Sequence, residues 1–320
     1  MKRIVSLLIL TCFSFIANGQ VWDNKSSGDW PVECKDVSII SSSDGKSQRA
    51  MFYPTEKSSP QPLIVSLHTW SGNYRQIDPL VVEIIRKGYN YIHPDFRGPN
   101  TNPDACCSDL TISDILDAII YSINTANVEP TEVHIIGCSG GGYLTLMLYM
   151  RLNYPVKSFS AWVPVSDLEE WYWQCKGRNL HYSRQIMNAT SSKEELNASE
   201  ARKRSPIFQQ FNEKLRKEVP LYIYAGIHDG YTGAVPVSQS VNMYNMLAYE
   251  ISKKRAVLIS DKEQLNLITN RSVAGYDKKP LIGEREILLH KKNGPVEIII
   301  FEGTHELLTD CALSLIPIKK

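Results

Sequence analysis

The fold is decided by the stretch Val133-His134-Ile135-Ile136-Gly137-Cys138-Ser139-Gly140-Gly141-Gly142. Its first four residues are mostly β-branched, which favours a buried strand, and residues 143–152 have helical spacing. Between them, residues 137–141 match the pattern Gly-x-Ser-x-Gly. A strand that becomes a helix within so few residues strains the backbone at the serine, and flanking glycines remove the Cβ atoms that would clash. The stretch therefore predicts a strand–turn–helix unit that presents the Ser139 hydroxyl at a sheet edge.

Other short apolar segments indicate the rest of a sheet. Two strands are predicted within 33–53, joined by a turn at Asp44-Gly45, and the others at 63–67, 89–93, 133–136, 158–163, 221–225 and 296–301. Helices are predicted at 81–86, ended by Gly88, and at 112–123, with Asp109 and Thr111 as candidate caps. Strands that alternate with helices predict an α/β fold with a mostly parallel central sheet of about eight strands flanked by helices.

Two long segments exceed this minimal pattern. Residues 167–217 are rich in aromatic and charged side chains and follow the sixth predicted strand, so they are expected to form a lid insertion. Residues 250–293 are polar, lie between the last two predicted strands, and are interpreted as a second insertion. Neither segment is interpreted as a separate domain, so residues 20–320 are predicted to form a single catalytic domain.

A serine hydroxyl becomes a good nucleophile only when a base removes its proton. Among the seven histidines, His305 follows the final predicted strand, where a loop could carry it over Ser139. His134 falls inside a strand and is expected to be structural, whereas His68 and His93 stand at strand ends. His305 is therefore the predicted base, with a surface loop histidine as the alternative.

The base needs an acid that fixes its tautomer and stabilises its charged form. Asp229 directly follows the penultimate predicted strand and has the best position, while Asp167, Glu302 and Asp310 are its competitors.

The tetrahedral oxyanion of such a reaction needs two hydrogen-bond donors. One is expected to be the backbone N–H of Gly140, and the other the backbone N–H of Trp70 in the loop at 68–72.

The first residues have the features of a signal peptide. Lys2 and Arg3 precede an uncharged apolar run at 4–16, and Ala17-Asn18-Gly19 places small residues before a cut. The pattern predicts a signal peptide over 1–19 and a secreted or periplasmic protein, with a membrane anchor as the alternative. A membrane span needs roughly 20 apolar residues, so none is expected in the mature chain.

The composition, 43% hydrophobic and 22% charged with a formal net charge of +1, is typical of a soluble globular protein. Without a surplus of basic residues, nucleic acid is not an expected partner. No cysteine or histidine spacing suits a zinc site, so no metal and no cofactor are expected. Cys138 is expected to be a buried thiol beside the serine. Export would allow disulfides, and the sequence leaves open the pairing among Cys34, Cys106, Cys107, Cys175 and Cys311.

Together these motifs resemble the prolyl-oligopeptidase-like branch of the α/β-hydrolases. The resemblance is carried by residues 68–72, 93–98, 137–143, 228–230 and 303–305. Members of the branch are peptidases and carboxylesterases, including esterases that remove acyl groups from plant polysaccharides. The resemblance implies an α/β-hydrolase fold with Ser139, Asp229 and His305 as the catalytic triad, in the chain order of that fold.

Two departures from the branch bear on the expected function. Peptidases of this branch usually carry a large additional domain, often a β-propeller, and too few residues precede the strand at 63 to form one. Thr69 stands where many relatives have glycine. The first departure favours a serine hydrolase that cleaves carboxylic esters through an acyl-enzyme, acting on a small-molecule or polysaccharide ester, as an acetyl or feruloyl esterase of plant or microbial glycans does. The alternatives are a serine exopeptidase or acylaminoacyl-type peptidase, and a catalytically inactive binding protein.

Candidate substrate-binding residues are aromatic, because aromatic faces suit both sugar rings and phenolic acyl groups. They are Tyr143, Trp171, Tyr172 and Trp173. For the last three the alternative is a hydrophobic helix packed on the sheet.

Arg178, His181 and Arg184 follow the aromatic run at near-helical spacing. They could bind an acidic substrate group, but a solvated face is the favoured interpretation.

Overall fold

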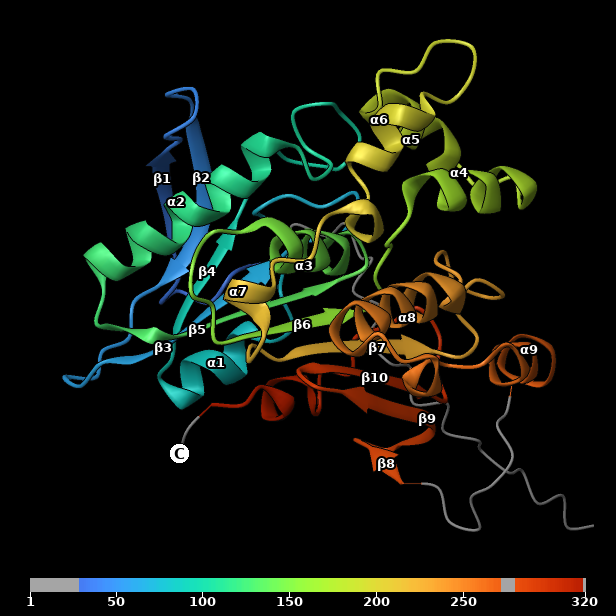
Figure 1. Ribbon diagram of the computed structural model, residues 1–320. Helices are drawn as coiled ribbons and strands as arrows, with labels where there is room; N and C mark the ends of the chain where they lie inside the picture. Colours follow the sequence, from blue (N-terminus) through green and yellow to red (C-terminus); the bar gives the residue numbers. More distant parts are fainter. Residues whose placement is uncertain (1–28, 272–279, 319–320) are drawn as a thin grey trace, which may run out of the picture.

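The computed structural model describes residues 29–271 and 280–318, and the signal peptide expected at 1–19 lies outside them. Within these residues ten strands form one mixed sheet, ordered β1-β2-β4-β3-β5-β6-β7-β10-β9-β8 (Figure 1). The strands are β1 (Lys35–Ile40), β2 (Ser47–Tyr53), β3 (Gln61–Leu67), β4 (Asn90–Pro94), β5 (Val128–Cys138), β6 (Ser158–Trp162), β7 (Leu221–Gly226), β8 (Leu281–Ile282), β9 (Arg285–Asn293) and β10 (Val296–Phe301).

The six central strands, β4, β3, β5, β6, β7 and β10, run parallel to one another, and the outer strands β1, β2, β9 and β8 pair antiparallel with their neighbours. Central parallel strands are covered on both faces, which explains their continuous apolar runs. The predicted α/β class and all eight predicted strands are confirmed.

The sequence pattern does not predict β8 and β9, which fall in the polar segment 250–293. β9 pairs antiparallel with β10, and only residues 287–289 in its middle are consecutively buried. Its other side chains are exposed or half-buried near the sheet edge, so the apolar pattern is too short to indicate a strand. This segment therefore extends the sheet, and it also contains the 3₁₀ turn η2 (Arg255–Val257) and the helix α9 (Asp261–Asn270).

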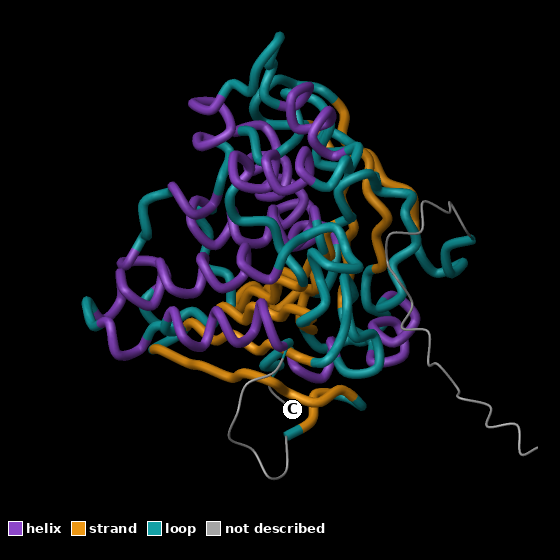
Figure 2. Tube along the Cα trace, turned by 90° about the vertical axis from the view of Figure 1, so that its right-hand side faces the viewer, coloured by secondary structure: helices purple, strands orange, loops and turns teal. Residues whose placement is uncertain are grey.

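Helices cover both faces of the sheet, as Figure 2 shows. They are α1 (Val81–Lys87), α2 (Asp109–Thr125), α3 (Gly140–Arg151), α4 (Leu168–Gly177), α5 (Tyr182–Ala189), α6 (Ala198–Lys203), α7 (Glu213–Arg216), α8 (Val237–Ser252) and α9 (Asp261–Asn270), with the 3₁₀ turns η1 (Pro206–Phe208), η2 (Arg255–Val257) and η3 (Ala312–Leu315).

Each face of the sheet has its own hydrophobic core. Val65 and Ile135 belong to the core shared with α2, α3 and α8, whereas Ile64 and Ile136 belong to the core shared with α1 and η3. Neighbouring residues of a strand thus point to opposite faces. The start of α2 corrects the prediction: it begins at Asp109, because the side chain of Ser108 caps it by accepting a hydrogen bond from Thr111 N.

Residues 167–217 contain the helices α4 to α7 between β6 and β7. Figure 1 shows α4, α5 and α6 grouped above α3 and α8. The insertion thus follows the sixth strand as predicted, and its action as a lid stays a prediction.

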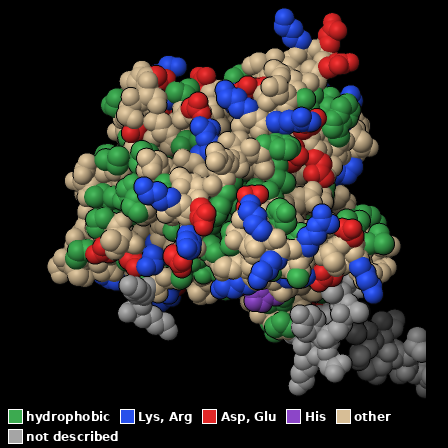
Figure 3. Space-filling view, in the orientation of Figure 1, with side chains coloured by type: hydrophobic (Ala, Val, Ile, Leu, Met, Phe, Trp, Pro, Cys, Tyr) green, Lys and Arg blue, Asp and Glu red, His purple; other side chains and the backbone are tan. Residues whose placement is uncertain are grey.

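The helices, the charged side chains and the cysteines of the described residues form no membrane span, metal site or disulfide. Acidic and basic side chains are mixed over the face shown in Figure 3. Within the described ranges no helix is long and apolar enough to cross a membrane, and no group of side chains could hold a metal ion. All six cysteines in this part of the chain are free thiols, so the structure pairs none of them.

Candidate active site

Sheet register brings three loops together at one edge. Leu67 at the end of β3 lies opposite Gly137 of β5, so the loop at 68–72 adjoins the turn that contains Ser139. Gly226 at the end of β7 lies opposite Phe301 of β10, so the loops that follow these two strands also adjoin. The carboxyl ends of parallel strands meet at the same sheet edge, where ligand sites of open α/β sheets lie.

Ser139, His305 and Asp229 form one hydrogen-bonded chain. Ser139 Oγ lies 2.8 Å from His305 Nε2, and His305 Nδ1 lies 2.7 Å from Asp229 Oδ2. All three residues are buried, at 7%, 7% and 5% exposure. A hydroxyl, an imidazole and a carboxylate at these separations can pass a proton from the hydroxyl to the imidazole.

The turn that carries Ser139 depends on close backbone packing. Ser139 has φ 57° and ψ −115°, a conformation that side chains disfavour. A Cβ on Gly141 would lie 2.2 Å from the carbonyl oxygen of Leu67, and one on Gly137 would lie 2.3 Å from Gly141 C. Gly137 thus lets β5 turn tightly into α3, and Gly141 lets the start of α3 approach the end of β3.

The acid loop, residues 229–235, holds the carboxylate of Asp229 with main-chain donors. Gly230 N and Val235 N each donate to Asp229 Oδ1 at 2.9 Å. These bonds leave Oδ2 to face His305. The rival carboxylates have other partners, because Asp167 caps α4 and Glu302 lies 2.5 Å from the His228 ring.

The oxyanion loop, residues 68–72, lies against the start of α3. A Cβ on Gly140 would lie 2.3 Å from Trp70 N, so the backbone nitrogens predicted to bind the oxyanion belong to residues in direct contact. No acceptor within the described residues takes a hydrogen bond from either N–H. By contrast, Thr69 N donates to Gln76 Oε1 at 2.8 Å, and Gln76 Nε2 donates to Thr69 Oγ1 at 2.9 Å.

A cavity of about 380 Å³ opens beside the imidazole. It is lined by Leu180, Tyr182, Thr232, Gly233, Ala234, Thr304 and His305. None of these side chains is an aspartate, glutamate, lysine or arginine. Leu180 and Tyr182 were not singled out from the sequence, although they follow the aromatic run of the insertion by only a few residues.

The predicted aromatic residues occupy different environments. Tyr143 is fully buried, and its hydroxyl donates to the carbonyl of Arg204 at 2.6 Å. Trp171 and Tyr172 are also buried, whereas Trp173 is 57% exposed. The substrate role of all four stays a prediction, and none of the four is among the described residues that line this cavity.

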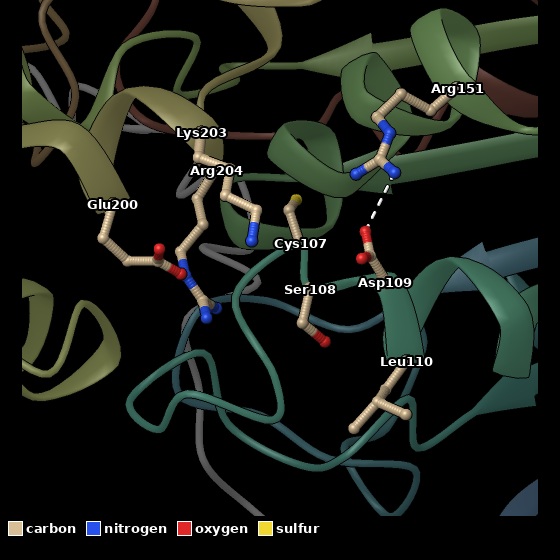
Figure 4. Close-up of a pocket in the computed structure, with 8 residues that line it drawn as sticks. All are labelled: Cys107, Ser108, Asp109, Leu110, Arg151, Glu200, Lys203 and Arg204. Carbon is tan, nitrogen blue, oxygen red and sulfur yellow. Dashed lines mark hydrogen bonds and ion pairs between the residues drawn. The ribbon is translucent and has the colours of Figure 1, made fainter. Parts of the chain in front are cut away.

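A second cavity, of about 210 Å³, lies between the start of α2 and α6 (Figure 4). Its two arginines are ion-paired, Arg151 with Asp109 at 2.8 Å and Arg204 with Glu200 at 2.7 Å. Cys107 also lines it, and burial raises the pKa of that thiol well above its usual range. The lining therefore offers neither an unpaired arginine nor a reactive thiolate.

A model of the prolyl oligopeptidase family matches residues 80–264, which is more than half of the chain. The chain belongs to the prolyl oligopeptidase family. Family membership agrees with the resemblance inferred from the motifs at 137–143, 228–230 and 303–305.

Individual proteins are similar to the chain at low sequence identity. The uncharacterized protein YfhR of Salmonella typhi is 27% identical over 123 residues, 38% of this chain and 42% of that protein. An acylaminoacyl peptidase in complex with Z-Gly-Gly-Phe-chloromethyl ketone superposes with a TM-score of 0.54 at 17% identity, over 68% of this chain and 35% of the other. A puromycin hydrolase superposes with a TM-score of 0.59 at 13% identity, over 88% of this chain and 38% of the other. The chain thus spans less than half the length of these relatives, and the structural matches show the shared α/β-hydrolase fold.

Proposed function

We propose that the chain is a serine hydrolase that cleaves its substrate through an acyl-enzyme on Ser139. The single observation that carries the proposal is the hydrogen-bonded chain from Ser139 Oγ through the His305 ring to Asp229 Oδ2. An inactive binding protein on the same fold would have no need to keep all three groups in register.

In the first step Ser139 Oγ attacks the carbonyl carbon while His305 Nε2 takes the hydroxyl proton. The carboxylate of Asp229 accepts from Nδ1–H and stabilises the imidazolium that forms. The N–H groups of Gly140 and Trp70 bind the developing oxyanion, and such donors contribute roughly 3 kcal/mol each to the transition state.

In the second step the tetrahedral intermediate collapses, and the imidazolium returns its proton to the leaving group. Water then attacks the acyl-enzyme with the His305 imidazole as base, and Ser139 is regenerated. His305 lines the cavity described above, and we propose that the leaving group and the incoming water reach the imidazole through it.

For the substrate we propose first an amide bond, in a peptide or a related acylated amine. The relatives named above include an acylaminoacyl peptidase and a puromycin hydrolase. The neutral lining of the cavity suits an uncharged residue beside the scissile bond, because a charged group would lose its hydration without gaining a partner.

The second candidate is the carboxylic ester expected from the sequence, including acyl esters of glycans. It is favoured by Tyr182 at the cavity and by the exposed Trp173 on the insertion, because aromatic rings stack on sugars and phenolic acyl groups. Export to the periplasm or beyond, through the signal peptide predicted at 1–19, is part of this proposal.

The proposal is tested by labelling with a fluorophosphonate probe, which reacts with activated serines. Wild type and a Ser314→Ala control should label, and Ser139→Ala should not. Labelling of Ser139→Ala would show that another residue is the nucleophile.

The two substrate classes are separated with a para-nitrophenyl ester and a para-nitroanilide of the same acyl group. Comparable kcat/KM values on both support the amide substrate, whereas hydrolysis of the ester alone supports the esterase.

A further inference from the structure

The acid loop is held in place by an arginine of the insertion. Arg178 follows the last residue of α4, and its Nη1 donates to the carbonyls of Gly230 at 2.7 Å and Gly233 at 2.9 Å. Its Nη2 donates to the carbonyl of Ala234 at 2.6 Å. A single guanidinium therefore binds three carbonyls of one short loop, which corrects the expectation of a solvated face for Arg178.

The same loop contacts both the acid and the base. A Cβ on Gly233 would lie 2.3 Å from Asp229 Oδ1 and 2.7 Å from His305 Cβ. Displacement of Gly233 would therefore push on the carboxylate and on the imidazole together. Val235, at the end of the loop, also donates to Asp229 Oδ1.

A residue of α4 itself assists Arg178. Trp171 Nε1 donates to the carbonyl of Ala234 at 3.1 Å, the same oxygen that Arg178 contacts. Arg178 forms no ion pair with a carboxylate of the described residues, so these carbonyls are the main partners of its charged guanidinium. Hydrogen bonds from a charged donor are about twice as strong as neutral ones.

We propose that Arg178 is a positioning residue for catalysis, through which the insertion sets the place of Asp229 and His305. The inference rests on the proposed function, because it assigns Arg178 to the same proton-transfer chain. Misplacement of a catalytic group by about 1 Å can cost roughly 100-fold in rate, so the effect should appear in kcat rather than in KM.

The test compares Arg178→Ala with Arg184→Ala, which removes an exposed arginine of the same insertion. With para-nitrophenyl acetate, Arg178→Ala should lower kcat by about 10- to 100-fold with little change in KM, and Arg184→Ala should match wild type. Millimolar guanidinium should partly restore kcat in Arg178→Ala alone, because it can occupy the vacated site.

Arg178→Lys provides the second variant, since an ammonium keeps the charge but lacks the planar fork that binds several carbonyls. It should show an intermediate kcat. Folded variants with a kcat within twofold of wild type, or a guanidinium effect that is equal in both alanine variants, would overturn the proposal. Loss of the folded state in Arg178→Ala and Arg178→Lys alike would also overturn it, in favour of a purely structural role.

The fluorophosphonate probe separates this inference from the proposed function. If wild type does not label, the proposed function fails. If wild type and Arg178→Ala label at equal rates, only the role of Arg178 fails.

Discussion

The proposed nucleophile, Ser139, and its two proposed partners, Asp229 and His305, are positioned in different ways. Ser139 stands on a turn whose shape is set by its own glycines and by the adjoining backbone of β3. Asp229 and His305 stand on loops that depend on distant side chains, Arg178 for the acid loop and Arg285, which pairs with Glu306 at 3.1 Å, for the base loop. Ser139 is thus fixed by close packing of backbone against backbone, whereas the loops of Asp229 and His305 also depend on side chains of remote segments.

The largest loss of kcat is expected from a substitution of Asp229. Asp229→Asn should lower kcat roughly 10,000-fold, because an amide can no longer stabilise the imidazolium or select its tautomer. Steady-state kinetics on an ester substrate measures this loss. Asp310→Asn, at an exposed competitor from the sequence, is the control, and a comparable loss there would point to the wrong acid.

A change in the turn that carries Ser139 should mainly lower the free energy of unfolding. Gly141→Ala inserts a Cβ 2.2 Å from the carbonyl oxygen of Leu67, so the free energy of unfolding should fall by about 3 kcal/mol. Gly177→Ala is the matched control, because its Cβ would meet nothing within 4 Å and alanine favours a helix by about 1 kcal/mol. Equal melting temperatures of the two variants would contradict the view that close backbone packing at Gly141 holds the turn.

The oxyanion loop lies between these two cases, because the side chain of Gln76, seven residues after Thr69, holds its backbone. Gln76→Ala removes both hydrogen bonds to Thr69 and should lower kcat about tenfold through misplacement of the Trp70 N–H. Gln210→Ala, at an exposed glutamine, should leave kcat unchanged. An unaltered kcat in a folded Gln76→Ala variant would show that Gln76 does not position the Trp70 N–H.

The smallest effect concerns His93, whose ring lies 6.1 Å from that of His68 beneath the oxyanion loop. Burial, and secondarily the charge of His68, lower the pKa of His93 to about 3. Between pH 8 and 5.5 the unfolded chain gains a proton that the folded chain refuses, so this group lowers the free energy of unfolding by about 1.4 kcal/mol.

Denaturant titrations at the two pH values measure that change. His93→Phe should reduce the pH dependence by the same amount, and His181→Phe, at an exposed histidine, should not. An unchanged pH dependence in His93→Phe would mean that the buried ring is protonated in the folded state.

What the sequence could predict divides the molecule differently. The turn at 137–141 and the positions of Asp229 and His305 after their strands were accessible, because each depends on a short local pattern. The contacts of Arg178 could not be predicted, because its acceptors are main-chain carbonyls more than fifty residues away. Every residue has such a carbonyl, so the residue types do not indicate which ones bind Arg178. β9 escaped prediction for a related reason, since its pairing with β10 compensates for a mainly polar sequence.

The insertion also reaches the oxyanion loop, because Trp70 Nε1 donates to Gln185 Oε1 at 2.8 Å. Exchange of residues 167–217 for the corresponding part of a relative would therefore alter turnover together with selectivity. Grafts that keep Arg178 and Gln185 and vary Leu180 or Tyr182 should separate the two properties. We therefore expect residues 167–217 to set the geometry of both loops, and not only access to the cavity.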